Sequence, residues 1–105
     1  MLRFALRQAL AALILITPAL AASPAEQRGK AYAVRHCAGC HSIDRRTPSR
    51  MMTAPPFRTL HTHYPIETLA EALAEGITTG HPAMPEVELQ PDRIHDLLSY
   101  LKTLE

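Results

Sequence analysis

The chain has two cysteines, separated by two residues and followed at once by a histidine: Cys37-Ala38-Gly39-Cys40-His41. Thiols at this spacing serve four chemistries: a disulfide, a dithiol oxidoreductase, a zinc site, or the attachment of haem through two thioethers. Only haem attachment uses every residue of the motif, because the thiols add to the haem vinyl groups and the histidine offers a ring nitrogen to the iron. The motif therefore predicts one covalently bound haem c, with His41 as an axial ligand.

The three other chemistries explain the motif less well. A structural zinc site usually takes four ligands, and the chain has no second cysteine pair to supply them. A dithiol oxidoreductase places its motif between a strand and a helix of an α/β fold, whereas the surroundings of Cys37 look helical. A plain disulfide remains open in an oxidising compartment, but it leaves His41 unexplained.

A second axial ligand decides what such a haem can do. Iron with one protein ligand can bind gases or peroxide, whereas iron with two protein ligands is suited to electron transfer. Met84 lies in the proline-flanked stretch His81-Pro82-Ala83-Met84-Pro85, 43 residues beyond His41, far enough for the chain to cross to the other face of a haem. We expect Met84 to be this ligand, with His81 as the main alternative. The remaining histidines and methionines are interpreted as surface, loop or pocket residues: His36, Met51, Met52, His61, His63 and His95.

Three helices are expected. Ser23, Pro24 and Glu26 form a capping-box pattern that begins a helix running to about Cys37. Pro65 can begin a second helix, which Gly76 ends. Pro91 begins the third, whose apolar residues recur at helical spacing: Ile94, Leu97, Leu98, Leu101 and Leu104. No run alternates as a strand would, so the expected fold class is all-α, with three to four short helices around one haem.

Two segments are expected to be loops. Residues 44–56 contain three prolines and no sustained period, and residues 76–90 contain two glycines and two prolines. Because residues 76–90 cannot hold regular structure, we expect them to wrap over another surface. The haem would supply a large apolar surface for it, in a chain whose aromatic content is only 5%.

Residues 1–21 have the pattern of a secretory signal peptide. Arg3 and Arg7 precede an apolar run too short for a comfortable membrane span, and Ala19-Leu20-Ala21 resembles a cleavage site. The expected cleavage point lies between Ala21 and Ala22, and an uncleaved N-terminal anchor is the alternative. The expected organisation is a signal peptide over 1–21 and one domain over 22–105, exported to the periplasm, with no membrane span after cleavage.

The charge balance excludes a nucleic-acid binder. Removing Arg3 and Arg7 leaves nine basic side chains against ten acidic ones. Three glutamates, Glu67, Glu71 and Glu75, recur at every fourth residue, and the loop after the haem motif carries Arg45, Arg46 and Arg50. A solvated helix face and a polar loop are the simplest interpretations, although either group could steer a partner.

The chain resembles a known family, the class I cytochromes c of small bacterial type. Four stretches carry the resemblance, in the order of that family: Cys37–His41, Ala54-Pro55-Pro56-Phe57, Gly80-His81-Pro82-Ala83-Met84-Pro85, and the closing helix from Pro91 to Leu101. They span nearly the whole of residues 22–105. The family often has an aromatic residue four positions before the first cysteine, where this chain has Ala33.

The resemblance implies specific roles for several residues. His41 and Met84 would be the two axial ligands. The carbonyl of Pro55 would accept the Nδ1 hydrogen of His41, with Pro56 as a less favoured acceptor. The first and last helices would cross, with Gly29 as the point of close approach and Tyr100 nearby.

The function expected from these residues is single-electron transfer in a respiratory chain, without transformation of a substrate. Its partners would be redox proteins: a donor dehydrogenase or membrane complex, and an acceptor oxidase or reductase. The protein would be a monomer or an accessory subunit. A haem-based sensor of small ligands, or a peroxidase-like protein with a labile sixth ligand, is the alternative.

Overall fold

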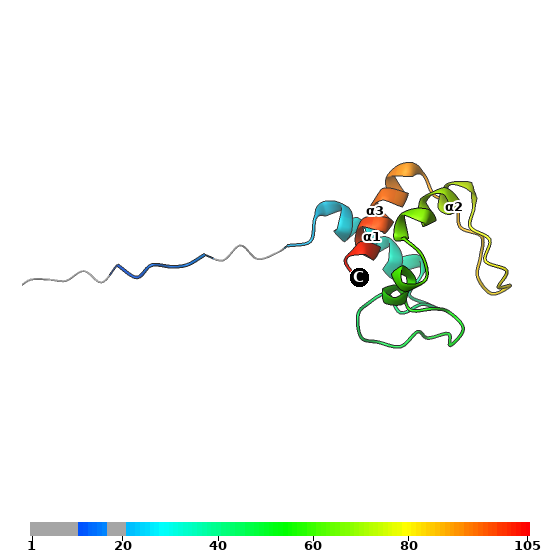
Figure 1. Cartoon of the computed structure of the whole chain (residues 1–105), viewed down its shortest axis with the longest axis horizontal. Coiled ribbons are helices and arrows are strands. Elements are labelled where there is room, and N and C mark those ends of the chain that lie inside the picture. Colours follow the sequence, from blue (N-terminus) through cyan, green and yellow to red (C-terminus); the bar gives the residue numbers. More distant parts are fainter. Residues whose placement is uncertain (1–10, 17–20) are drawn as a thin grey trace, which may run out of the picture.

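The computed structural model describes residues 11–16 and 21–105. Its elements are the helices α1 (Pro24–His36), α2 (Leu69–Glu75) and α3 (Pro91–Lys102), and the 3-10 turns η1 (Phe57–Thr62) and η2 (Ile66–Thr68). Between residues 21 and 105 there is no strand, only an isolated antiparallel bridge between Ile77 and Val87. The expected all-α fold is confirmed (Figure 1).

The first helix begins where the sequence predicts. The hydroxyl of Ser23 accepts a hydrogen bond from the Glu26 backbone N–H (3.2 Å), and the Glu26 carboxylate accepts one from the Ser23 N–H (3.3 Å). This reciprocal pair satisfies two amide donors that a helix start otherwise leaves without partners. The helix ends at His36 with Cys37 as its C-cap, so α1 carries the first cysteine at its end.

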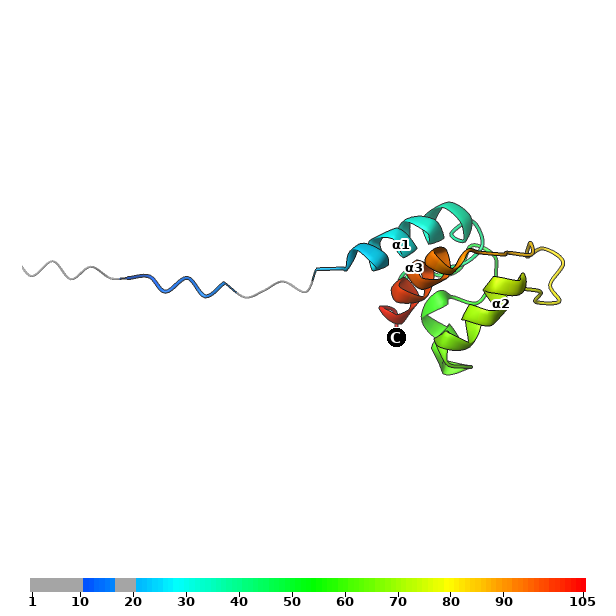
Figure 2. The same ribbon diagram turned by 90° about the horizontal axis from the view of Figure 1, so that it is seen from above.

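α1 and α3 pack against each other, as Figures 1 and 2 both show. Gly29 makes the close approach possible. A Cβ atom added there would overlap the backbone carbonyl of Asp96 and lie 2.8 Å from Cβ of Tyr100. Ala33, one turn further along α1, is fully buried in the core. The close approach implied by the resemblance is confirmed, and the small side chain of Ala33 fits the contact between the helices.

Polar side-chain contacts join α3 to two other parts of the molecule. Arg28 on α1 donates to both carboxylate oxygens of Asp96 on α3, at 3.0 and 3.1 Å. Asp96 is buried, and this guanidinium lowers the pKa of its carboxyl group. The Tyr100 hydroxyl donates to the carbonyl of Ile43 at 2.5 Å. Together these contacts connect the last helix to the first helix and to the segment that follows the haem motif.

The second predicted helix is present, but its first turn is tighter than expected. Residues Ile66–Thr68 form the 3-10 turn η2, and α2 continues from Leu69 to Glu75 before Gly76. The turn η1 (Phe57–Thr62) was not predicted, because it follows two prolines and its apolar residues do not repeat at the helical period. Phe57 and Leu60 of η1 nevertheless belong to the core.

The loop over residues 44–56 is held by its own hydrogen bonds. One carboxylate oxygen of Asp44 accepts from the backbone N–H groups of Arg46 and Thr47, both at 2.7 Å. A hydrogen bond from the Thr47 hydroxyl, together with these two backbone bonds, lowers the pKa of Asp44 to about 2. The Arg58 guanidinium donates to the Ser42 hydroxyl (3.1 Å) and the Thr47 carbonyl (2.8 Å). The segment is irregular, as predicted, yet organised.

The proposed signal peptide falls largely outside the described residues, since 1–10 and 17–20 are not among them. Among the residues that are described, no helix has both the length and the apolar character needed to cross a membrane.

Candidate functional site

The cysteine motif lies in the turn that directly follows α1. The Cys37 N–H donates to the Ala33 carbonyl at 2.9 Å, and the His41 N–H donates to the Cys37 carbonyl at 2.9 Å. Both thiols are partly exposed and not bonded to each other. The helix and its continuation therefore present Cys37, Cys40 and His41 on the wall of one cavity.

The His41 ring is held in one orientation. Its Nδ1 atom lies 2.7 Å from the carbonyl oxygen of Pro55, which has no hydrogen to donate. In the neutral ring the hydrogen therefore lies on Nδ1 and Nε2 keeps its lone pair, as a metal ligand requires. The ring also packs on Phe57, with centroids 4.9 Å apart. The carbonyl of the alternative acceptor, Pro56, instead accepts from the backbone and hydroxyl of Thr59.

The space in front of His41 consists of two adjoining cavities of about 240 and 300 Å³. Their walls are mainly apolar, and neither lining includes an arginine or a lysine. Eight residues line both cavities: His36, Cys37, His41, Pro55, Phe57, His81, Met84 and Val87. The fold thus brings Met84 and His41, 43 residues apart in sequence, to one shared space.

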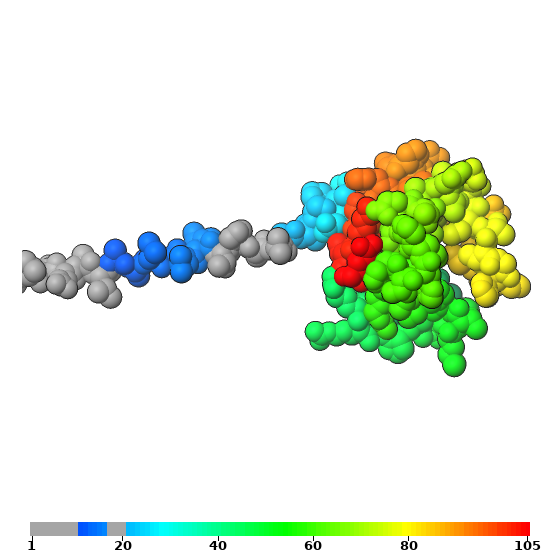
Figure 3. Space-filling model, in the orientation of Figure 1, coloured from blue at the N-terminus to red at the C-terminus, as the bar shows by residue number. Residues whose placement is uncertain are grey.

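The segment that carries Met84 projects from the helices as a long loop, yellow in Figures 1 and 3. Few backbone hydrogen bonds hold it. The Ile77 N–H donates to the Val87 carbonyl (2.9 Å), the Met84 N–H to the His81 carbonyl (3.0 Å), and the Leu89 N–H to the Leu73 carbonyl (2.8 Å). Met84 is half-buried and His81 is exposed, and both line the cavities. The sequence candidate and its main alternative therefore both reach the site.

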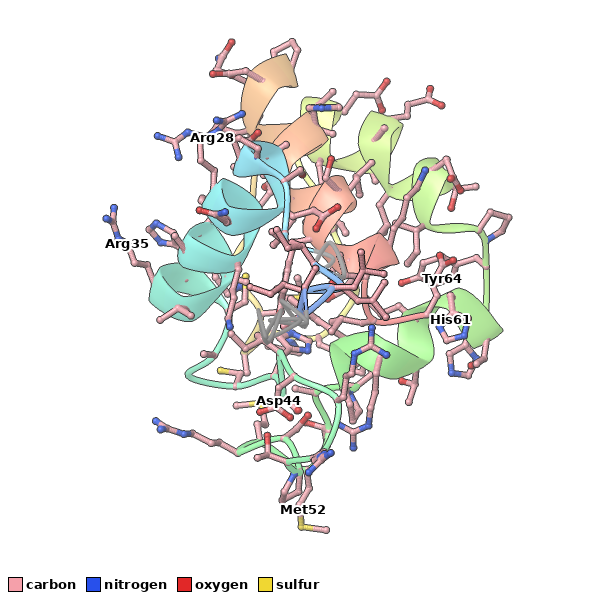
Figure 4. All side chains as sticks on the ribbon, turned by 90° about the vertical axis from the view of Figure 1, so that its left-hand side faces the viewer. Arg28, Arg35, Asp44, Met52, His61 and Tyr64 are labelled. Atoms are coloured by element: carbon pink, nitrogen blue, oxygen red, sulfur yellow. The ribbon has the colours of Figure 1, made fainter. Side chains whose placement is uncertain are left out.

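The other histidines and methionines separate into two groups. His36 and Met51 line part of the cavity region. His61, His63, His95 and Met52 are exposed and line neither cavity, and Met52 is 98% exposed. Figure 4 shows Met52 at the tip of its loop, pointing away from the helices.

The chemistry of the donors fits a covalently bound haem better than the alternatives. Burial raises the pKa of Cys37 to about 11, whereas the attacking cysteine of a dithiol oxidoreductase has a lowered pKa. In the part of the chain that the structure describes, no three His, Cys, Asp or Glu side chains gather closely enough to hold a metal ion by themselves. Two thiols, an oriented imidazole and a thioether around an apolar cavity are what a c-type haem needs.

The comparison with protein families decides the identity. The family model for cytochrome c matches residues 26–105, which is more than half of the chain. The chain belongs to the cytochrome c family. Cytochromes c carry a covalently bound c-type haem and transfer electrons, and the motif for covalent attachment is present here. Comparisons with curated proteins and with solved structures find no match.

The larger haem cavity of this cytochrome is lined in part by apolar residues that recur at helical spacing: Leu69 and Leu73 of α2, and Leu97 and Leu101 of α3. The sequence carries that signal in both helices. Sequence reasoning missed Tyr64, which lines the same cavity. Tyr64 lies just after η1, where no periodic pattern singles it out.

Proposed function

We propose that His41 and Met84 are the two axial ligands of a haem attached to Cys37 and Cys40, and that the protein carries single electrons in the periplasm. The observation that supports this most strongly is that His41 and Met84 come from distant segments and line the same apolar cavities. The haem iron supplies the one-electron redox change, and a methionine–histidine ligand pair raises its potential.

Different parts of the chain would have different roles at the haem. Pro55 holds the His41 ring through Nδ1, which keeps the imidazole oriented and increases its basicity as a ligand. The mainly apolar lining would cover the apolar faces of the haem. Because the helix crossing and the His41 turn are tightly packed, little rearrangement would accompany a change of oxidation state. Fast electron exchange benefits from such rigidity.

The same proposal assigns residues 1–21 to a cleaved signal peptide and residues 22–105 to one cytochrome domain. Two features support export: the basic start with its apolar run, and the stretch Ala19-Leu20-Ala21, which resembles a cleavage site. A mass measurement on the purified protein tests both. We expect the mass of residues 22–105 plus one haem, and the mass of the uncleaved chain would point to an N-terminal anchor.

We propose that the protein is not an enzyme. Its partners would be a donor dehydrogenase or membrane complex and an acceptor oxidase or reductase. What supports this is that the proposal engages the ionisable groups of the motif, Cys37, Cys40 and His41, in holding the haem, which leaves them unable to act in general acid–base chemistry.

A potentiometric titration of the exported holoprotein, followed by visible absorption, tests the carrier. We expect a single reversible one-electron wave and low-spin spectra at both ends, because both axial positions stay filled. A high-spin spectrum in either oxidation state would contradict the proposal and favour the sensor or peroxidase-like alternative.

A further inference from the structure

Beside the two haem cavities, a groove lies between the outer face of α1 and the segment that leads into α3. It encloses about 500 Å³. The α1 residues that line it are spaced by three to four positions, so they share one face of that helix. The side chains used below are Arg28, Tyr32, Arg35, His36, Glu88 and Arg93.

The groove has an excess of positive charge. Arg28 is engaged by Asp96, which leaves its charge largely compensated. Among the described residues, neither Arg35 nor Arg93 has a carboxylate within ion-pair distance. Glu88 is the one acidic side chain in the lining. Figure 4 shows Arg35 projecting outward from α1, away from the other helices.

The groove also adjoins the haem cavity. Tyr32 and His36 line both the groove and the larger cavity, and their rings pack together with centroids 4.5 Å apart. A molecule bound in the groove would therefore sit beside the redox centre, separated from it by two side chains.

We propose that this groove docks an acidic segment of the redox partner, whose carboxylates bind Arg35 and Arg93. The inference rests on the proposed function, since it gives the electron carrier its contact site. From Arg28 to Arg35 the groove runs roughly 10 Å along α1, at 1.5 Å of rise per residue. That length suits several residues of a peptide chain rather than one small ion. Guanidinium groups favour carboxylates because they can donate two parallel hydrogen bonds.

The groove competes with one other basic surface, the loop that carries Arg45, Arg46 and Arg50. That loop lies next to Met51 and Thr53, which also line the haem cavity. Its three arginines are exposed and line neither the haem cavities nor the groove, and Arg45 donates to the Thr103 carbonyl. We therefore assign docking to the groove and use the loop as the control.

The test titrates reduced, ¹⁵N-labelled holoprotein with a hexaglutamate peptide at low ionic strength, followed by NMR. We expect amide shifts concentrated in residues 28–36 and 88–93 and suppressed by salt, because the contact is between exposed charges. Hexaglutamine is the matched neutral peptide and should cause no shifts. Two double variants carry the same change in net charge: Arg35→Glu/Arg93→Glu in the groove and Arg46→Glu/Arg50→Glu in the loop.

The groove variant should weaken peptide binding about tenfold or more, and the loop variant less than about threefold. Equal weakening would show that net charge alone attracts the peptide, and stronger weakening by the loop variant would move docking to the loop. Inorganic phosphate that saturates the same amides as tightly as the peptide would indicate a small-anion site. Each of these results overturns the inference. Potentiometry on the same sample without peptide tests the proposed function. The docking inference and the proposed function can therefore fail separately.

Discussion

The two sides of the haem cavity are built differently. On one side, His41 follows the end of α1, its ring is hydrogen-bonded to Pro55, and the adjoining loop is held by Asp44 and Arg58. On the other side, Met84 lies in a long loop connected by a single β-bridge between Ile77 and Val87. The histidine side is thus fixed by packing and hydrogen bonds, and the methionine side mainly by the bond its sulfur would make to the iron.

This difference indicates which side of the haem cavity should open first. Local opening takes place where buried contacts are few and backbone hydrogen bonds are exposed. We therefore expect the Met84 loop to open before the His41 side does. The predictions below perturb one side at a time. Gly39→Ala serves as a shared control, because a Cβ there meets nothing within 4 Å.

The largest effect on stability is expected at the crossing of α1 and α3, which supports the histidine side of the cavity. Gly29→Ala places a methyl group on the Asp96 carbonyl, which cannot move without displacing a helix. We expect a loss of about 3 kcal/mol or more in the free energy of unfolding. Urea unfolding of the holoprotein measures it. Equal stability of Gly29→Ala and Gly39→Ala would show that the crossing is looser than described.

The next largest effect is on the midpoint potential, and it concerns the methionine side of the cavity alone. Met84→Ala should leave the haem attached, because both thioethers and His41 are intact, but it should open the sixth coordination position. We expect the midpoint potential to fall by an amount on the order of 100 mV. Potentiometry measures this, and Met52→Ala, at a fully exposed methionine, should leave the potential unchanged. If Met84→Ala also leaves it unchanged, His81 becomes the leading candidate for the ligand.

The sequence predicted the two sides unequally well. The Cys37–His41 motif and the capping box of Ser23 are local patterns, so they could be identified without a structure. The position of Met84 depends on a loop that crosses the cavity, and the sequence could only propose it from the flanking prolines. The turn η1 has no periodic apolar pattern to mark it, and the groove beside Arg93 depends on contacts between distant segments, which no local pattern records.

A smaller effect is expected from the backbone of the Met84 loop. Gly80 has a φ of +76°, which costs a residue with a side chain about 1 kcal/mol or more. Gly80→Ala should therefore favour the open loop. We expect roughly fivefold faster binding of imidazole to the oxidised protein. Stopped-flow absorption measures the rate, and Gly39→Ala should bind imidazole as the unmodified protein does.

The smallest effect concerns pH. The pKa of Asp96 is lowered in the folded state by its hydrogen bonds from Arg28, below an unfolded value of about 3.9. Its contribution to stability is therefore present above about pH 4 and is lost as the pH falls through the folded pKa.

Asp96→Asn should accordingly destabilise the protein at pH 7, and the difference from the unmodified protein should shrink toward pH 3. Urea unfolding at both pH values tests this. Glu71→Gln, at an exposed carboxylate without an ion pair among the described residues, is the control. A difference for Asp96→Asn that stays constant with pH would mean that the Arg28 contact does not favour the charged carboxylate.

The central claim is that protein side chains occupy both axial positions of the haem. Carbon monoxide added to the reduced, exported holoprotein tests it most directly, with visible absorption as the readout. We predict a c-type spectrum that does not change at once, because Met84 must first leave the iron. An immediate shift on mixing would show an open or labile sixth position and would contradict the electron-carrier account.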